Sequence, residues 1–253
     1  MSGKREQDLP FPQVAMVTGA GSGIGRATAL RLAALGSKVV VGYNRGSEAA
    51  EQAVSELDGS GHLALRVAFE DADSIAAAAA EIDARFGRLD ALVNNAGSTV
   101  PVPLNDLEAL TDEIFDQVVR INLRGPFSVV RALRLLLEKG DNAAIVNVSS
   151  LAAQTGMGSS LAYCAAKSGL DALTVGLARV LAPKVRVFSV SPAGVDTAFV
   201  PGRTREQLEA MAQKMPLRKV TSADDVARAI VACITHLTSA TGIVVTVDEG
   251  RHL

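Results

Sequence analysis

Cysteine and histidine are scarce in this 253-residue sequence, which contains two cysteines and three histidines. Cys164 and Cys233 are too few for a disulfide framework, and the scattered histidines give no spacing that suits a metal ion. An excess of one charge is also missing, because 25 lysines and arginines against 27 aspartates and glutamates leave a formal net charge of −2. Without basic runs, this balance argues against nucleic-acid binding. We therefore expect neither a metal centre nor a nucleic-acid partner.

Long hydrophobic runs are absent as well. Two stretches without charge, residues 142–166 and 229–247, contain polar residues at short intervals, which interrupt any continuous apolar helix. The first dozen residues are polar and contain proline, so residues 1–12 are predicted to form a flexible tail rather than a secretory signal. These observations predict a cytoplasmic protein without a membrane span.

Short apolar runs rich in valine alternate with longer helical patterns along the chain. The expected strands are residues 14–18, 38–43, 63–68, 90–93, 143–149, 185–191 and 243–247. The expected helices are residues 23–35, 47–57, 73–86, 111–137, 160–181 and 223–236. Near-continuous apolar strands separated by helices are typical of a parallel sheet covered on both faces. We predict an α/β fold: a single doubly wound Rossmann-like domain over residues 13–253, with a seven-stranded, mostly parallel sheet and helices on both faces.

One segment, residues 192–216, departs from this alternation, because only residues 203–214 suggest a helix. An insertion of that length is more often a lid than a linker, so we expect it to cover a substrate. Arg203 and Arg205 within it either meet an acidic substrate or are simply solvated. The other candidate substrate contacts form a mainly apolar set: Thr99, Val100, Gln154, Met157, Val195, Phe199, Val200, Met211 and Met215.

Two expected helices are too apolar to be covered by one sheet. Residues 111–137 carry apolar side chains on nearly every face, and residues 163–178 contain only two charges, Lys167 and Asp171. One side of such a helix packs on the strands and the other would meet water, so a partner chain is a plausible cover. We predict a homodimer or a homotetramer.

A glycine-rich turn, TGAGSGIG at residues 18–25, follows the first expected strand and opens a helix. Its spacing is GxxxGxG, at Gly19, Gly23 and Gly25, rather than GxGxxG. Glycines let the backbone turn sharply and approach a pyrophosphate, whose charge is met by the N–H groups at the helix start. A glycine-rich helix entry without a ligand is the alternative. The strand–turn–helix context favours nucleotide binding.

A second pattern joins Tyr163, Lys167 and Ser150. Positions i and i+4 share one face of a helix, so Lys167 is expected beside Tyr163. A neighbouring ammonium stabilises a phenolate and lowers its pKa, which makes a tyrosine usable as a general acid or base. Ser150 ends a buried strand, at the sheet edge where ligands bind in such folds. A surface tyrosine with a solvated lysine is the alternative for the YxxxK pattern alone.

These motifs stand in order with NNAG at residues 94–97, Asn122 within INLRGPF, and SPAGVDT at residues 191–197. In this combination the chain resembles the short-chain dehydrogenase/reductase family from residue 13 to residue 250, and 3-oxoacyl-acyl-carrier-protein-reductase-like members within it. The resemblance implies an NAD(P)(H)-dependent oxidoreductase that interconverts a ketone and a secondary alcohol, with an NADPH-dependent carbonyl reductase as the leading form. A non-catalytic dinucleotide-binding sensor or scaffold on the same fold is the alternative.

The resemblance also implies roles for individual residues. Tyr163 is the proton donor, Lys167 holds the nicotinamide ribose and tunes Tyr163, and Ser150 polarises the carbonyl. Asn122 anchors a water in the proton relay. The family's Pro-Gly pair after the sixth strand is Pro192-Ala193 here, with the glycine one place later. The implied cofactor contacts are Thr18, Gly19, Gly23, Ile24, Gly25, Asn44, Arg45, Ser47, Asn94, Ala96, Gly97, Tyr163, Lys167, Pro192, Gly194, Val195 and Thr197.

The choice between NADP and NAD is expected just after the second strand. An acidic residue there suits the ribose hydroxyls of NAD, whereas arginine suits the 2′-phosphate of NADP. This chain has Asn44, Arg45 and Ser47 and no acid before Glu48, which favours NADP(H) and leaves NAD(H) possible. The partner is expected to be a small carbonyl or alcohol substrate, which the sequence does not identify.

Overall fold

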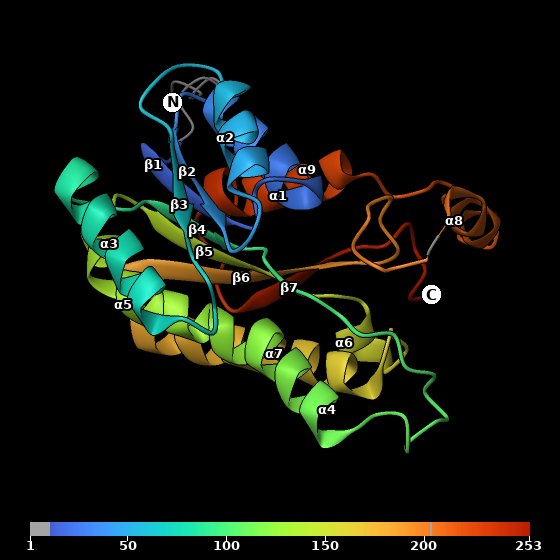
Figure 1. Cartoon of the computed structure of the whole chain (residues 1–253). Coiled ribbons are helices and arrows are strands. Elements are labelled where there is room, and N and C mark those ends of the chain that lie inside the picture. Colours follow the sequence, from blue (N-terminus) through green and yellow to red (C-terminus); the bar gives the residue numbers. More distant parts are fainter. Residues whose placement is uncertain (1–10, 203) are drawn as a thin grey trace.

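Seven strands form a parallel sheet in the computed structural model, which describes residues 11–202 and 204–253 (Figure 1). The strand order is β3-β2-β1-β4-β5-β6-β7, and each pair of neighbours is parallel. The predicted α/β fold is therefore confirmed. The strands are β1 (Val14–Thr18), β2 (Lys38–Tyr43), β3 (Leu63–Arg66), β4 (Ala91–Asn94), β5 (Ala143–Val148), β6 (Val185–Pro192) and β7 (Ile243–Val247).

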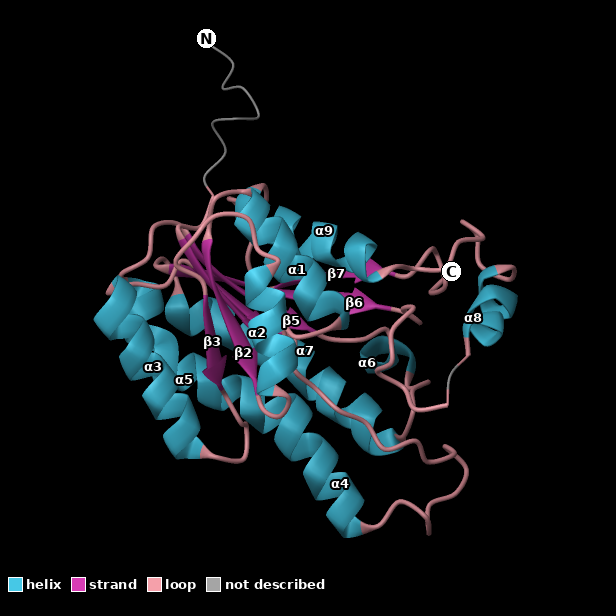
Figure 2. Ribbon diagram, turned by 45° about the horizontal axis from the view of Figure 1, so that its top comes forward, coloured by secondary structure: helices cyan, strands magenta, loops and turns pink. Residues whose placement is uncertain are grey.

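Helices cover both faces of this sheet, as Figures 1 and 2 show. One face packs on α1 (Gly23–Ala34), α2 (Ser47–Ser55) and α9 (Ala223–Thr235) through a fully buried core that includes Leu32 and Ile230. The other packs on α3 (Ala72–Phe86), α5 (Gly125–Glu138) and α7 (Leu161–Leu181). Two buried faces explain why β1, β4 and β5 consist entirely of buried residues.

The remaining helical elements lie near the carboxyl ends of the strands. These are α4 (Asp112–Val119), α6 (Ala152–Thr155), α8 (Arg205–Ala212) and a single turn of π-helix, η2 (Arg120–Arg124), which joins α4 to α5. Residues 111–137 are thus helical as predicted, with one widened turn between two α-helices. The short α6 was not predicted, since four residues are too few to show a helical period.

The order of the strands places a ligand site. The chain runs outward from β1 to β3 and then returns to add β4 on the other side of β1. Loops that follow β1 and β4 therefore diverge, and in open α/β sheets ligands bind in the crevice that this divergence leaves.

Some local details differ from expectation. β3 ends at Arg66 rather than at residue 68, because the Ala68 backbone N–H bonds to the Ser74 hydroxyl (3.0 Å) instead of a neighbouring strand. Residues 1–10 of the predicted tail lie outside the described residues, and so does Arg203. Pro12, which the prediction places in the flexible tail, is held in place, because its carbonyl oxygen accepts a 2.5 Å hydrogen bond from the Ser37 hydroxyl. No helix in the described ranges has the length and apolarity that crossing a bilayer requires. The cytoplasmic location stays a prediction.

Candidate active site

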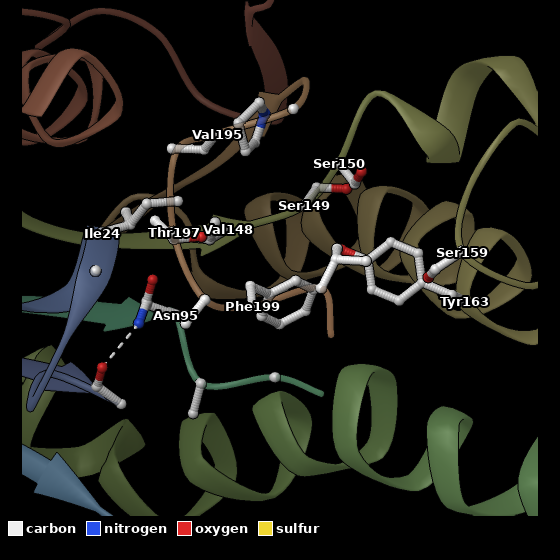
Figure 3. A pocket seen from close by; sticks show the side chains of 18 of the residues that line it. Ile24, Asn95, Val148, Ser149, Ser150, Ser159, Tyr163, Val195, Thr197 and Phe199 are labelled. Carbon is white, nitrogen blue, oxygen red and sulfur yellow. Dashed lines mark hydrogen bonds between the residues drawn. The ribbon is translucent and has the colours of Figure 1, made fainter. Parts of the chain in front are cut away.

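A cavity of about 910 Å³ opens at the carboxyl edge of the sheet. It is lined by the segments that follow β1, β2, β4, β5 and β6, by the first two turns of α7, and by Arg251 after β7. Figure 3 shows part of the wall, where Tyr163 and Phe199 lie side by side and Ser149 and Ser150 come from a neighbouring segment. The ring centroids of Tyr163 and Phe199 are 6.0 Å apart.

The glycine turn forms one end of this cavity. Gly19 and Gly23 have φ angles of 65° and 54°, in the left-handed region that favours glycine. A Cβ on Gly25 would lie 2.4 Å from the carbonyl oxygen of Gly19, so a larger residue would push α1 away from β1. No side chain in the described part of the chain caps the start of α1. An uncapped helix start behind glycines is a fitting cradle for a pyrophosphate.

Thr18 and Asn95 hold this turn against β4. The Thr18 hydroxyl accepts hydrogen bonds from the backbone N–H groups of Asn95 and Ala96, both at 3.0 Å. The Asn95 amide donates to the carbonyl oxygens of Thr18 (2.9 Å) and Gly19 (3.2 Å). Thr18 and Gly25 brace the turn from behind, whereas Gly19, Gly23, Ile24, Asn95, Ala96 and Gly97 line the cavity.

Asn94 does not line the cavity. Its amide donates to Asn147 (2.9 Å), whose own amide donates to Thr174 on α7 (2.9 Å). These fully buried polar groups tie β4 and β5 to α7. Asn94 therefore sits where it can brace the cofactor site, and the neighbouring Asn95 is the asparagine at the surface of the cavity.

The segment after β2 forms the far wall beyond the glycine turn. Tyr43, Asn44, Arg45 and Gly46 line it, and the Asn44 amide donates to Glu70 at 3.3 Å. Arg45 is exposed, with no carboxylate within ion-pair distance among the described residues. Ser47 begins α2 just outside the lining. A guanidinium at this place suits a phosphate group better than a bare ribose.

Tyr163 and Lys167 lie in the first two turns of α7. The Ser160 hydroxyl accepts from the Tyr163 backbone N–H (3.3 Å), which fixes the start of that helix. Tyr163 is 8% exposed and lines the cavity. The Lys167 ammonium lies 5.7 Å from the centre of the Tyr163 ring and donates to the carbonyl oxygen of Val148 at 2.8 Å. As predicted, the two side chains lie next to each other on one face of the helix.

Burial dominates the electrostatics of Lys167. It is 4% exposed, and burial lowers the pKa of its ammonium from an ordinary value of 10.5 to about 8, against the opposing charge of Asp171. Asp171 lies one turn further along α7 and accepts a 2.5 Å hydrogen bond from the Ser189 hydroxyl on β6. The ammonium is therefore mostly charged at pH 7, although its pKa of about 8 lies only a little above that pH.

Ser150 and Asn122 occupy different depths. Ser150 lines the cavity, and its hydroxyl oxygen accepts from the backbone N–H of Ala152 at 3.2 Å, which leaves its proton available to a ligand. Asn122 is fully buried in η2, where its amide donates to the carbonyl oxygens of Ser98 (2.7 Å) and Val118 (2.9 Å). Its own carbonyl oxygen has no protein partner in the described ranges and lies directly behind Gly97.

The predicted lid, residues 192–216, supplies the wall opposite α6. Residues 192–200 line the cavity, among them Pro192, Gly194, Val195 and Thr197. Of the nine candidate substrate contacts, four line it: Met157, Val195, Phe199 and Val200. Thr99, Val100, Gln154, Met211 and Met215 do not. Arg205 is also outside, where it pairs with Asp196 and Glu209.

Among the lining residues that the sequence did not single out as contacts are Asn95 and Arg251. Asn95 stands within the NNAG motif, so its place was readable in principle. Arg251 had no local signal, because its approach to the cavity depends on how the chain folds after β7.

Comparison with known proteins places this geometry in a family. The family model described as short chain dehydrogenase matches residues 13–208. The chain is 38% identical over 244 residues to the cis-4-hydroxycyclohexanecarboxylate dehydrogenase of Sinomonas cyclohexanicum, across 94% of this chain and 96% of that one. It is 33% identical over 225 residues to the 3-oxoacyl-acyl-carrier-protein reductase FabG of Staphylococcus aureus, across 88% and 90%. A solved dehydrogenase/reductase from Sinorhizobium meliloti 1021 superimposes with a TM-score of 0.85 at 33% identity, across 94% of each chain.

Proposed function

The chain belongs to the short-chain dehydrogenase family, and from this membership we propose that it is an NADPH-dependent carbonyl reductase, which reduces a ketone to a secondary alcohol. The family membership shows that the chain is an oxidoreductase that acts on alcohol or ketone groups with a nicotinamide dinucleotide. The observation that carries the finer proposal is the placement of Ser150, Tyr163 and Lys167 around one cavity that ends at an uncapped, glycine-rich helix start.

The reacting carbonyl is assigned to the space between Ser150 and Tyr163. The Ser150 hydroxyl donates a hydrogen bond to the carbonyl oxygen and so stabilises the negative charge that develops there. Tyr163 then gives its phenolic proton to the same oxygen. The Lys167 ammonium stabilises the phenolate that remains and holds it in place until a new proton arrives. We assign the unpaired carbonyl oxygen of Asn122 to a water that supplies this proton.

The dinucleotide is assigned to the length of the cavity. When bound, it supplies the hydride that reduces the carbonyl carbon. The N–H groups at the start of α1 would hold its pyrophosphate, Arg45 its 2′-phosphate, and Lys167 its nicotinamide ribose. Asp196 is the acid among the cavity-lining residues, and its ion pair with Arg205 reduces its repulsion of a phosphate. NADP(H) is thus the favoured cofactor, with NAD(H) as the alternative.

Assembly into a homodimer or homotetramer is part of the same proposal. On the outer sides of α5 and α7, Leu135 and Val180 are 69% and 71% exposed, and Phe127 is 40% exposed. Apolar side chains of this size on two neighbouring helices favour a partner surface. We propose that a second copy of the chain packs against these apolar side chains.

Turnover of a panel of carbonyls tests the function. We expect oxidation of NADPH in the presence of cyclic ketones or 3-oxoacyl thioesters. Replacing Tyr163 by Phe keeps the ring but removes its proton, so turnover should fall by at least about 10²-fold while NADPH binding persists. A Tyr163→Phe enzyme with near-normal turnover would refute the assigned mechanism and would favour the non-catalytic sensor or scaffold.

A further inference from the structure

The last six residues form a closed turn rather than a frayed end. The buried carboxylate of Asp248, at the end of β7, accepts hydrogen bonds from the backbone N–H groups of Gly250 (3.1 Å) and His252 (2.8 Å). The His252 ring lies 2.8 Å from the same carboxylate. Arg251 stands between these anchored neighbours, and its own N–H bonds to the carbonyl oxygen of Asp248 at 3.0 Å.

This turn packs on the end of the predicted lid, residues 192–216. The Leu217 N–H donates to the carbonyl oxygen of Glu249 (3.2 Å), and the Thr221 hydroxyl donates to the Glu249 carboxylate (3.3 Å). A Cβ on Gly250 would lie 2.8 Å from the ring of Pro216, so the Gly250 backbone packs closely against this proline side chain. Figures 1 and 2 both show the C-terminus beside α8 and the ends of β6 and β7. The backbone of Arg251 is therefore held at the mouth of the cavity.

The charges that line the cavity are few, and most have partners. Asp196 pairs with Arg205, and the Lys167 ammonium is buried against α7 and β5. In the described part of the chain, the guanidinium groups of Arg45 and Arg251 lie within ion-pair distance of no carboxylate, although both residues line the cavity. Apart from Lys167, which is assigned to the cofactor, these two are the cationic side chains of the described wall that a ligand can meet.

The sheet separates these two arginines widely. Arg45 follows β2 and Arg251 follows β7, and five strand spacings of about 4.8 Å between them amount to roughly 24 Å at the carboxyl edge. The glycine turn after β1 is itself four spacings from β7. By strand order Arg251 therefore stands on the side of the cavity that carries Ser150, whereas Arg45 and the start of α1 stand on the other side.

The same geometry brings Arg251 near the reacting group. Val247 pairs with Pro192, and the Pro192 carbonyl oxygen accepts from the N–H of Leu151, next to Ser150. The root of the C-terminal turn is thus two strand spacings, roughly 10 Å, from the segment that carries Ser150. A substrate whose ketone meets Ser150 can reach Arg251 with a group only a few bonds away.

We propose that Arg251 binds a carboxylate on the substrate, so that the enzyme prefers small keto acids, or the matching hydroxy acids, over neutral analogues of equal size. The inference rests on the proposed function. A guanidinium offers two parallel donors to the two oxygens of a carboxylate, and a single cation balances a single negative charge. Arg251 acts as a specificity-determining residue, since it lies away from the reacting atoms.

Kinetics with a matched substrate pair test this assignment. The full-length enzyme is assayed with NADPH and either 4-oxocyclohexanecarboxylate or its methyl ester, which differ in charge but carry the same ketone. Because Arg251 is exposed until substrate covers it, we expect the acid to be favoured in kcat/KM by about tenfold, between the effects of open and desolvated ion pairs. Arg251→Gln should remove this preference by raising KM for the acid about tenfold relative to KM for the ester, and Arg251→Lys should retain part of the preference.

The control is Arg228→Gln, which removes an exposed arginine on α9 that does not line the cavity. It should leave the preference for the acid intact. An acid-to-ester ratio that is the same in the wild-type and Arg251→Gln enzymes overturns the assignment, as does a wild-type preference for the ester.

Binding separates failure of this inference from failure of the proposed function. If the wild-type enzyme reduces no ketone with either cofactor, the proposed function fails. Calorimetric titration of the acid and the ester into the NADP-loaded protein then still tests Arg251. Tighter binding of the acid that is lost in Arg251→Gln supports the assignment, and equal binding of both compounds overturns it.

Discussion

The charge on Lys167 predicts an unusual dependence of stability on pH. Burial lowers the pKa of this ammonium to about 8 in the folded chain, whereas an unfolded lysine keeps a value near 10.5. Between these values the unfolded state binds more protons than the folded state, so the free energy of unfolding rises with pH. The destabilisation by the buried charge is fully present below pH 8 and disappears as the pH approaches 10.5.

The size of the effect follows from the two pKa values. A shift of 2.5 units corresponds to about 3.4 kcal/mol, of which about 2.5 kcal/mol is recovered between pH 7 and pH 10. Replacing Lys167 by Met keeps an unbranched side chain but removes the titration. It also removes the hydrogen bond to Val148, a cost that does not change with pH. Relative to the variant, the lysine-containing protein should therefore gain about 2.5 kcal/mol over this range.

Urea denaturation at pH 7, 8, 9 and 10 measures this gain. Because a phenol titrates at about pH 10 and Tyr163 lies beside the ammonium, both proteins should carry Tyr163→Phe, so that Lys167→Met is the only difference. A difference in unfolding free energy that changes by less than about 0.5 kcal/mol across the series would show that the buried ammonium titrates as it does in water. The inference that burial controls the charge of Lys167 would then lose its basis.

Three further predictions concern the cofactor, the cover and the assembly. Arg45→Asp should weaken NADPH binding by one to two powers of ten, since charge-assisted hydrogen bonds contribute about 1.5–3 kcal/mol, and should favour NADH; a wild-type enzyme that already binds NADH more tightly would contradict this. The predicted lid, residues 192–216, should exchange amide hydrogens faster than β4 and β5 and slow down when substrate binds; equal protection without ligand argues against a lid. Light scattering should give a dimer or tetramer, and a fully active monomer would exclude the proposed role of Leu135 and Val180.

The sequence predicts those parts of the site that are local. The turn from Thr18 to Gly25 is read directly, because strand, glycines and helix start follow one another along the chain. Tyr163 and Lys167 are equally local, since one helical turn sets their relation. Residues of both motifs line the cavity.

Parts that depend on a strand boundary or on distant packing were not readable. The resemblance implied a contact from Asn94, the last residue of β4, whereas the structure has Asn94 donating to Asn147 and places Asn95 at the cavity. Which of these adjacent asparagines faces the cavity depends on the packing of β4 between β1 and β5, which the sequence does not show. Arg251 reaches the cavity only because β7 pairs with β6 and Gly250 packs on Pro216, two contacts between segments far apart in sequence.

The π-helical turn at η2 sets the phase between the two halves of a long helix. Its hydrogen bonds reach one residue further than those of an α-helix, so its five residues advance the helix by about as much as four α-helical residues at 100° each. The widened turn thus holds one extra residue, while α5 keeps the face on which Val129, Leu133 and Leu137 pack against the sheet. A deletion of one residue here would let the backbone that presents Asn122 close into a regular α-turn with little rotation of α5, so it would alter the active site while largely sparing the core.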